Sequence, residues 1–143
     1  MAKSKVIVAL RDLHSVESLV TLACQLSKGM DAEVIALHVV EVPMATPLDA
    51  GEVLDHPGRE ILAAAKKVGD RFSRSITTQL LRAREAGEAI VGEARDQGAE
   101  LLVMGHHKPH PYPLGELLLG STVQYVTRHA PCRVVVQIPP PAR

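Results

Sequence analysis

Five short segments rich in aliphatic residues are the feature that most restricts how this chain can fold. They occupy residues 5–10, 32–42, 76–83, 100–105 and 132–138. The run KVIVAL at residues 5–10 is typical of a strand buried on both faces of a sheet, and we expect the same of residues 32–42. We therefore expect five strands, and we expect the sheet to be covered on both sides.

Between these runs, apolar residues recur at the spacing of a helix face. The predicted helices occupy residues 16–29, 59–75, 88–98 and 121–130. Ser15 and Ser121 are suited to cap the first and the last of them, because a serine hydroxyl can accept from free N–H groups. A loop with three prolines, residues 43–58, is longer than most loops in compact domains, which predicts a functional or a mobile segment.

Strands that alternate with helices predict an α/β fold, a doubly wound open parallel sheet with helices on both faces. The 143 residues fit a single domain, residues 1–143, whose last residues, 138–143, form a proline-rich tail. Ligands of such sheets bind beyond the carboxyl ends of the strands. Arg11 and Asp12, the segment 39–42 and the loop after Gly105 should meet there.

The composition excludes several classes of function. Aromatic residues make up 2% of the chain and the formal net charge is zero, which argues against a nucleic-acid partner. No apolar run approaches the roughly 20 residues of a membrane span, so direct membrane insertion is not expected. Two cysteines without a paired motif are consistent with a reducing, cytoplasmic setting.

The segment from Gly105 to Thr122 carries the strongest functional pattern. Gly105 follows a strand, and Gly120, Ser121 and Thr122 open a helix, whose free N–H groups favour an anion. The alternative is an ordinary strand-to-helix loop, with glycine for the turn and serine as the helix cap. The residue pattern alone leaves both interpretations open.

Three histidines in the same loop raise the question of a metal site. His106, His107 and His110 could each supply an imidazole ligand, but no nearby cysteine or spaced carboxylate completes a tetrahedral set. We therefore predict a solvated polar loop and no metal. Ser121 has no histidine and acid partner at triad spacing, and no other catalytic set is evident, so we expect no enzymatic activity.

The chain resembles the universal stress protein family over essentially its whole length. The resemblance rests on KVIVAL at the start, AEVIALHVV, GEAIVGEARDQGAELLVMG and LLLGSTVQYVTRHAPCRVVV. It implies a five-stranded parallel sheet in the order 3-2-1-4-5. It also implies, for one branch of the family, ATP binding through a motif of spaced glycines that ends in Gly-Ser or Gly-Thr.

The chain matches that motif only in part. Gly105 corresponds to the first glycine and Gly120-Ser121 to the final pair, whereas Lys108 replaces the second glycine. Eleven residues rather than nine then precede Gly120. The resemblance therefore implies a degenerate crevice for a nucleotide or another anion, with ATP or another adenine nucleotide as the ligand to test. Its candidate residues are Ala9, Arg11, Asp12, Val39, Val40, Met104, Gly105, Lys108, Gly120, Ser121 and Thr122.

The leading hypothesis is a cytoplasmic regulatory or stress-related binding module that is not an enzyme. The first alternative is a cytoplasmic regulatory domain of an amino-acid or cation transporter. It rests on the loop VPMATPLDAGE, which resembles stress-protein domains that are attached to such transporters. The second is a stress protein that binds ATP and hydrolyses it slowly. In the implied strand order, Val134, Val135 and Val136 form an apolar edge, which predicts a homodimer through the last strand.

Overall fold

A computed structural model describes residues 3–49, 54–106 and 119–138 of the chain. Its five strands form one parallel sheet in the order β3-β2-β1-β4-β5, as predicted. The strands are β1 (Ser4–Ala9), β2 (Ala32–Glu41), β3 (Ile76–Ala83), β4 (Leu101–Gly105) and β5 (Arg133–Gln137). Each begins and ends within one residue of its expected bounds.

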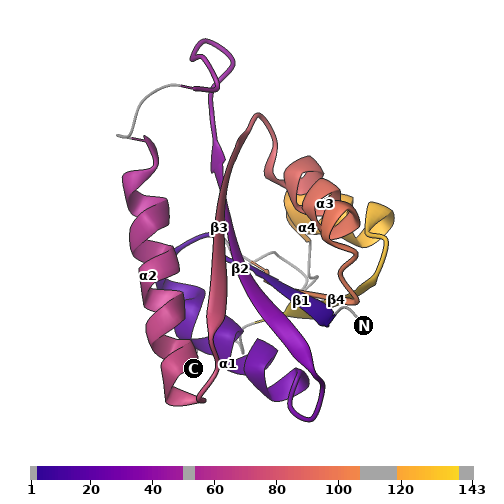
Figure 1. The fold of residues 1–143 in the computed structure, drawn as a ribbon. Helices are drawn as coiled ribbons and strands as arrows, with labels where there is room; N and C mark the ends of the chain where they lie inside the picture. The colour runs from indigo at the N-terminus through magenta and orange to yellow at the C-terminus, as the bar shows by residue number, and fades with distance from the viewer. Residues whose placement is uncertain (1–2, 50–53, 107–118, 139–143) are drawn as a thin grey trace, which may run out of the picture.

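Helices cover both faces of this sheet. α1 (Val16–Leu26), preceded by a short 3₁₀ helix η1 (Leu13–Ser15), and α2 (His56–Arg71) lie together on one face, and α3 (Ala86–Gln97) and α4 (Ser121–His129) lie on the other (Figure 1). On their face, α1 packs on β1 and β4, and α2 packs on β2 and β3. The predicted doubly wound α/β fold is therefore confirmed.

The core consists of two aliphatic layers, one on each side of the sheet. Val6, Val8 and Val103 point toward α1 and α2, whereas Ile7 and Leu102 point toward α3 and α4. All five are fully buried. Burial of one such side chain contributes about 1.5–3 kcal/mol, so the alternation along β1 and β4 stabilises both helix layers at once.

The caps of two helices differ from the sequence expectation. Ser15 occupies the cap position of α1, but its side chain makes no cap bond. Asp12 instead caps the preceding η1, where its Oδ1 accepts from the Ser15 backbone N–H at 3.0 Å. At the last helix, Ser121 is the first helical residue and Gly120 occupies the cap position.

The second helix also begins earlier than predicted, at His56 rather than Arg59. Pro57 lies in its first turn, where a proline is tolerated because the N–H it lacks has no partner within the helix. Gly69 within this helix has a packing reason: a Cβ there would lie 2.2 Å from Cγ1 of Ile76. α2 therefore approaches β3 more closely than any side chain at residue 69 would allow.

Candidate functional site

The carboxyl ends of the strands are staggered, and this creates the candidate site. β1 ends at Ala9, and the last bond between it and β2 runs from the Leu10 N–H to the Leu37 carbonyl, at 2.8 Å. β2 continues to Glu41, paired with β3 on its other side. The last residues of β2 therefore extend beyond β1, next to the position where the strand order reverses between β1 and β4.

Of the two valines predicted here, Val39 is the one whose backbone faces the gap above β1. In a parallel sheet, alternate residues direct their N–H and C=O groups to opposite neighbours. The carbonyl of Leu37 points to β1, and the N–H of Val42 donates to Ala83 on the β3 side. Val39 therefore presents a donor and an acceptor toward the crevice, whereas Val40 is directed to β3.

Two other predicted residues, Ala9 of β1 and Met104 of β4, differ in whether they border the crevice. Ala9 is half-buried and ends β1, where it pairs with Leu37 and Met104. Met104 is 4% exposed and packs in the core beneath α3 and α4. Ala9 thus borders the crevice, whereas the side chain of Met104 belongs to the hydrophobic layer below it.

Arg11 and Asp12 follow β1 directly and border the same gap. Arg11 is exposed, so its guanidinium is available to an anionic group. Asp12 is half-buried and uses one carboxylate oxygen to cap η1. The local fold therefore gives Asp12 a structural role, in addition to the predicted contact with a ligand.

Gly105 ends β4 opposite Gln137 of β5. A Cβ at this position would lie 3.2 Å from Cδ1 of Leu19 in α1, and the residue has no positive φ. The glycine therefore permits close packing between β4 and α1. The sharp turn that the sequence suggested is not its structural reason.

The N-terminus of α4 lacks a side-chain cap. Gly120 is the cap residue, with φ −65° and ψ 164°, and the first turn holds no acidic residue. Gly120 and Ser121 are exposed, and Thr122 is half-buried. The free N–H groups of this turn, with the partial positive charge of the helix end, are suited to bind an anion.

His106 is the main departure from the predicted solvated loop. The residue is 4% exposed, and its backbone N–H donates to the Gln137 carbonyl at 2.9 Å. Within the described residues neither ring nitrogen has a hydrogen-bond partner. Burial of this imidazole was not evident from the sequence, because three neighbouring polar residues and prolines predict solvent exposure.

The remaining predicted loop residues, Lys108, His107 and His110, lie outside the described residues. Within residues 3–49, 54–106 and 119–138, no three histidine, cysteine, aspartate or glutamate side chains lie close enough together to hold a metal ion. Over those same ranges, no helix is long and apolar enough to cross a membrane.

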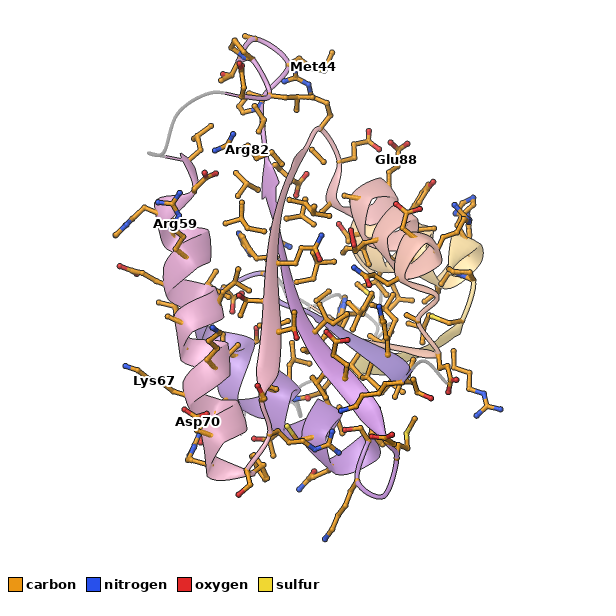
Figure 2. All side chains as sticks on the ribbon, viewed as in Figure 1. Met44, Arg59, Lys67, Asp70, Arg82 and Glu88 are labelled. Carbon is orange, nitrogen blue, oxygen red and sulfur yellow. The ribbon has the colours of Figure 1, made fainter. Side chains whose placement is uncertain are left out.

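A second polar cluster at this edge of the sheet was missed by the sequence reasoning. Asp55, at the start of α2, is 2% exposed and receives a bidentate hydrogen bond from Arg82 of β3, with Nε at 2.9 Å from Oδ1. This hydrogen bond lowers the pKa of the Asp55 carboxyl below its usual value of 3.8. Figure 2 shows Arg82 and Arg59 near the first turn of α2. The only sequence signal was an aspartate just before a helix, which is common.

Arg84 fixes the start of the long loop near this cluster. Its Nη1 donates to the carbonyl oxygens of Val42, Pro43 and Thr46, at 3.3, 2.5 and 2.7 Å. Met44, at the tip of this segment beyond the end of β2, is 83% exposed (Figure 2). The first part of the loop is therefore held by β3, although its tip projects into solvent.

The family of the chain follows from its relatives. The model of the universal stress protein family matches residues 3–137. A universal stress protein of Methanocaldococcus jannaschii is 35% identical over 121 residues, which cover 80% of this chain and 69% of that protein. Universal stress protein A homolog 2 of Coxiella burnetii is 31% identical over 137 residues and 92% of each chain. The chain belongs to the universal stress protein family.

Solved structures of this family share the fold. The universal stress protein of Archaeoglobus fulgidus in complex with dAMP has a TM-score of 0.75 and 18% identity, with coverage of 95% of this chain and 98% of that one. A family protein of Arabidopsis thaliana with AMP bound has a TM-score of 0.67 and 17% identity, over 94% and 91% of the two chains. Identities this low establish the shared architecture, and the ligands named are those of the other proteins.

Proposed function

We propose that this chain is a regulatory binding protein that holds a phosphate-bearing ligand, an adenine nucleotide, in the crevice beyond β1 and β4. The observation that carries the proposal is the uncapped first turn of α4, with no acidic residue, at the carboxyl edge of the sheet. An anionic group bound there would satisfy N–H groups that no side chain of the helix cap satisfies.

The β2 side of the crevice is suited to bind the adenine of a nucleotide. Val39 offers one backbone donor and one backbone acceptor, the pattern that an adenine edge can match. Arg11, exposed at the end of β1, adds a positive charge. The complexes of relatives with dAMP and AMP support an adenine nucleotide as the ligand class.

The protein acts by binding rather than by catalysis. Hydrolysis of a nucleotide needs a group that positions or deprotonates water, and commonly carboxylates that hold a metal ion. Asp12, the carboxylate at the end of β1, is engaged in capping η1. The proposal therefore assigns the bound nucleotide a regulatory role.

A nucleotide panel tests this function. Thermal unfolding is measured with ATP, ADP, AMP and adenosine, since a ligand that binds the native state raises its Tm. We expect a rise with the phosphate-bearing compounds, and a smaller rise in Ser121→Pro, which removes a backbone donor from the first turn of α4. The exposed Ser75→Pro variant is the control outside the crevice. Unchanged Tm values with all four compounds would contradict the proposal.

We further propose that two copies of the chain pair through β5. β5 lies at one edge of the sheet, and Val134, Val135 and Val136 are only half-buried along it. Pairing with a second copy would satisfy the free backbone groups of this edge. Light scattering should give the mass of a dimer for the wild type and that of a monomer for Val135→Lys. A dimeric mass in both would contradict pairing at this edge.

Attachment to, or regulation of, a membrane transporter stays a prediction. Its test is whether the protein is recovered with a transporter when a tagged copy is purified from its native membrane fraction. The nucleotide panel is independent of that outcome, because it concerns the crevice alone.

A further inference from the structure

The buried imidazole of His106 lies on the side of the sheet that α4 covers. Along β4, Leu102 and Met104 pack in the core layer beneath α3 and α4. His106 continues the strand pairing through its bond to Gln137, so alternation places its side chain on the same side as those two residues. The side chain is therefore on the same face as α4.

His106 and the first turn of α4 also lie at the same end of the sheet. A helix that connects two parallel strands runs back across the sheet, so the N-terminus of α4 lies near the carboxyl end of β4. His106 follows that carboxyl end directly. The chain thus places an imidazole and a helix N-terminus at one end of one face, although thirteen residues lie between His106 and Gly120 in the sequence.

Both groups lack a partner within the described part of the chain. The two ring nitrogens of His106 make no hydrogen bond there, and α4 has no side-chain cap. Buried polar atoms without a partner are rare in native proteins, because leaving them unpaired costs free energy. A neutral imidazole has one N–H to donate, and an imidazolium has two. Two sets of donors at the same end of the same face suit an acceptor with several oxygens.

We infer that His106 donates a hydrogen bond to a phosphate oxygen of the ligand, together with the N–H groups at the start of α4. This inference rests on the proposed function, and it adds a specificity residue that recognises the phosphate rather than the nucleoside. The ring nitrogens of His106 have no partner among the described residues because the ligand supplies it. The ligand-free protein therefore carries a stability cost that the bound state removes.

His106→Leu separates this role from a structural one. Leucine has a similar volume and no polar atom, so it removes the unpaired nitrogens from the buried position. We expect the Tm of the ligand-free variant to rise by roughly 3 °C and its affinity for AMP and ATP to fall about tenfold or more. A histidine with a merely structural role would show either no change or a fall in stability. The control is His129→Leu, an exposed histidine at the far end of α4.

Calorimetric titrations with AMP, ATP, adenosine and inorganic phosphate are performed on the wild type and on each variant. We expect the loss only for the compounds that contain phosphate. Equal AMP affinity in His106→Leu and the wild type would overturn the inference and leave the proposed function intact. An equal loss for adenosine and AMP would overturn the assignment to phosphate. If the wild type binds none of the compounds, both the inference and the proposed function fail.

His106→Asn and His106→Gln keep the inference testable if the leucine variant does not fold. Each retains an amide donor close to the position of one ring nitrogen. The variant whose amide lies close to the donating ring nitrogen should retain more affinity for AMP. The other variant should lose affinity for AMP. Wild-type affinity in both variants would contradict the inference. Nitrogen-15 spectra of the wild-type imidazoles should show the His106 signals shifting when AMP is added.

Discussion

Two corners at the carboxyl edge of the same sheet contrast in how their polar groups are satisfied. At the β2–α2 corner, Asp55 is paired with Arg82, and Arg84 donates to three backbone carbonyls. At the β4–α4 corner, His106 is buried without a partner among the described residues and α4 has no side-chain cap. At the first corner the polar groups are hydrogen-bonded within the chain, whereas at the second the donors of His106 and α4 have no such partner among the described residues.

This difference teaches where stability and binding reside in the molecule. Groups that are satisfied internally stabilise the fold and have little left to offer a ligand. Groups that are left unsatisfied cost stability until a ligand supplies the partner. Substitutions at the β2–α2 corner should therefore change the free energy of unfolding, and substitutions at the β4–α4 corner should chiefly change binding.

The largest effect is expected from Asp55→Asn, which removes the charge that pairs with Arg82. The hydrogen bond from Arg82 lowers the folded-state pKa of Asp55 below 3.8, so the paired carboxylate stabilises the fold above that pH. We expect the Tm at pH 7 to fall by roughly 5 °C or more. The difference from the wild type should shrink as the pH falls through the folded-state pKa, because the wild-type carboxylate then takes up a proton.

The matched control is Asp49→Asn. Asp49 is exposed and close enough to Arg82 to influence it by charge alone, and pairs of this kind contribute little. A Tm difference between wild type and Asp55→Asn that stayed constant from pH 7 down to pH 2 would show that the carboxylate is not the stabilising group.

Two glycine substitutions compare the corners directly, with a moderate effect expected at one of them. A Cβ at Gly58 would lie 2.6 Å from Cδ2 of His38, whereas a Cβ at Gly120 would meet no atom of the described residues within 4 Å. Gly58→Ala should lower the free energy of unfolding by about 1–3 kcal/mol, because a packed neighbour must move. Gly120→Ala should change it by at most about 1 kcal/mol. Urea unfolding measures both, and a larger loss at Gly120 would reverse the comparison.

The smallest effect concerns Arg84, whose bonds hold a segment at the surface. Arg84→Met should leave the global Tm within about 2 °C of the wild type, because the segment it holds contributes little to the core. Amide exchange should become faster in residues 43–46 and stay unchanged in β4. The control is Arg95→Met, an exposed arginine on α3. Unchanged exchange in 43–46 would show that the segment is held by other contacts.

The strand positions were predictable for a definite reason, whereas the strand order was implied by the resemblance to the universal stress protein family. The inner strands β1, β2 and β4 are buried at their centres, so their sequences are mostly apolar runs that few other structures accommodate. The helix caps were less predictable: the Ser15 side chain makes no cap bond to α1, Asp12 caps η1, and Gly120 rather than Ser121 occupies the cap position of α4. Capping depends on where the chain turns after a strand, and that position is set by packing of the helix on the sheet.

For the candidate site, the sequence by itself determined which segments meet, because parallel strands bring their carboxyl ends to one edge. It therefore identified Arg11, Asp12, Gly105 and Gly120-Ser121-Thr122 as a group. Only the tertiary structure decided that Val39 rather than Val40 faces the crevice, since strand stagger and hydrogen-bond alternation are properties of the assembled sheet. The tertiary structure also decided that His106 is buried and that Asp55 pairs with Arg82. Both features depend on contacts between residues that are distant in sequence or on the space that remains after packing.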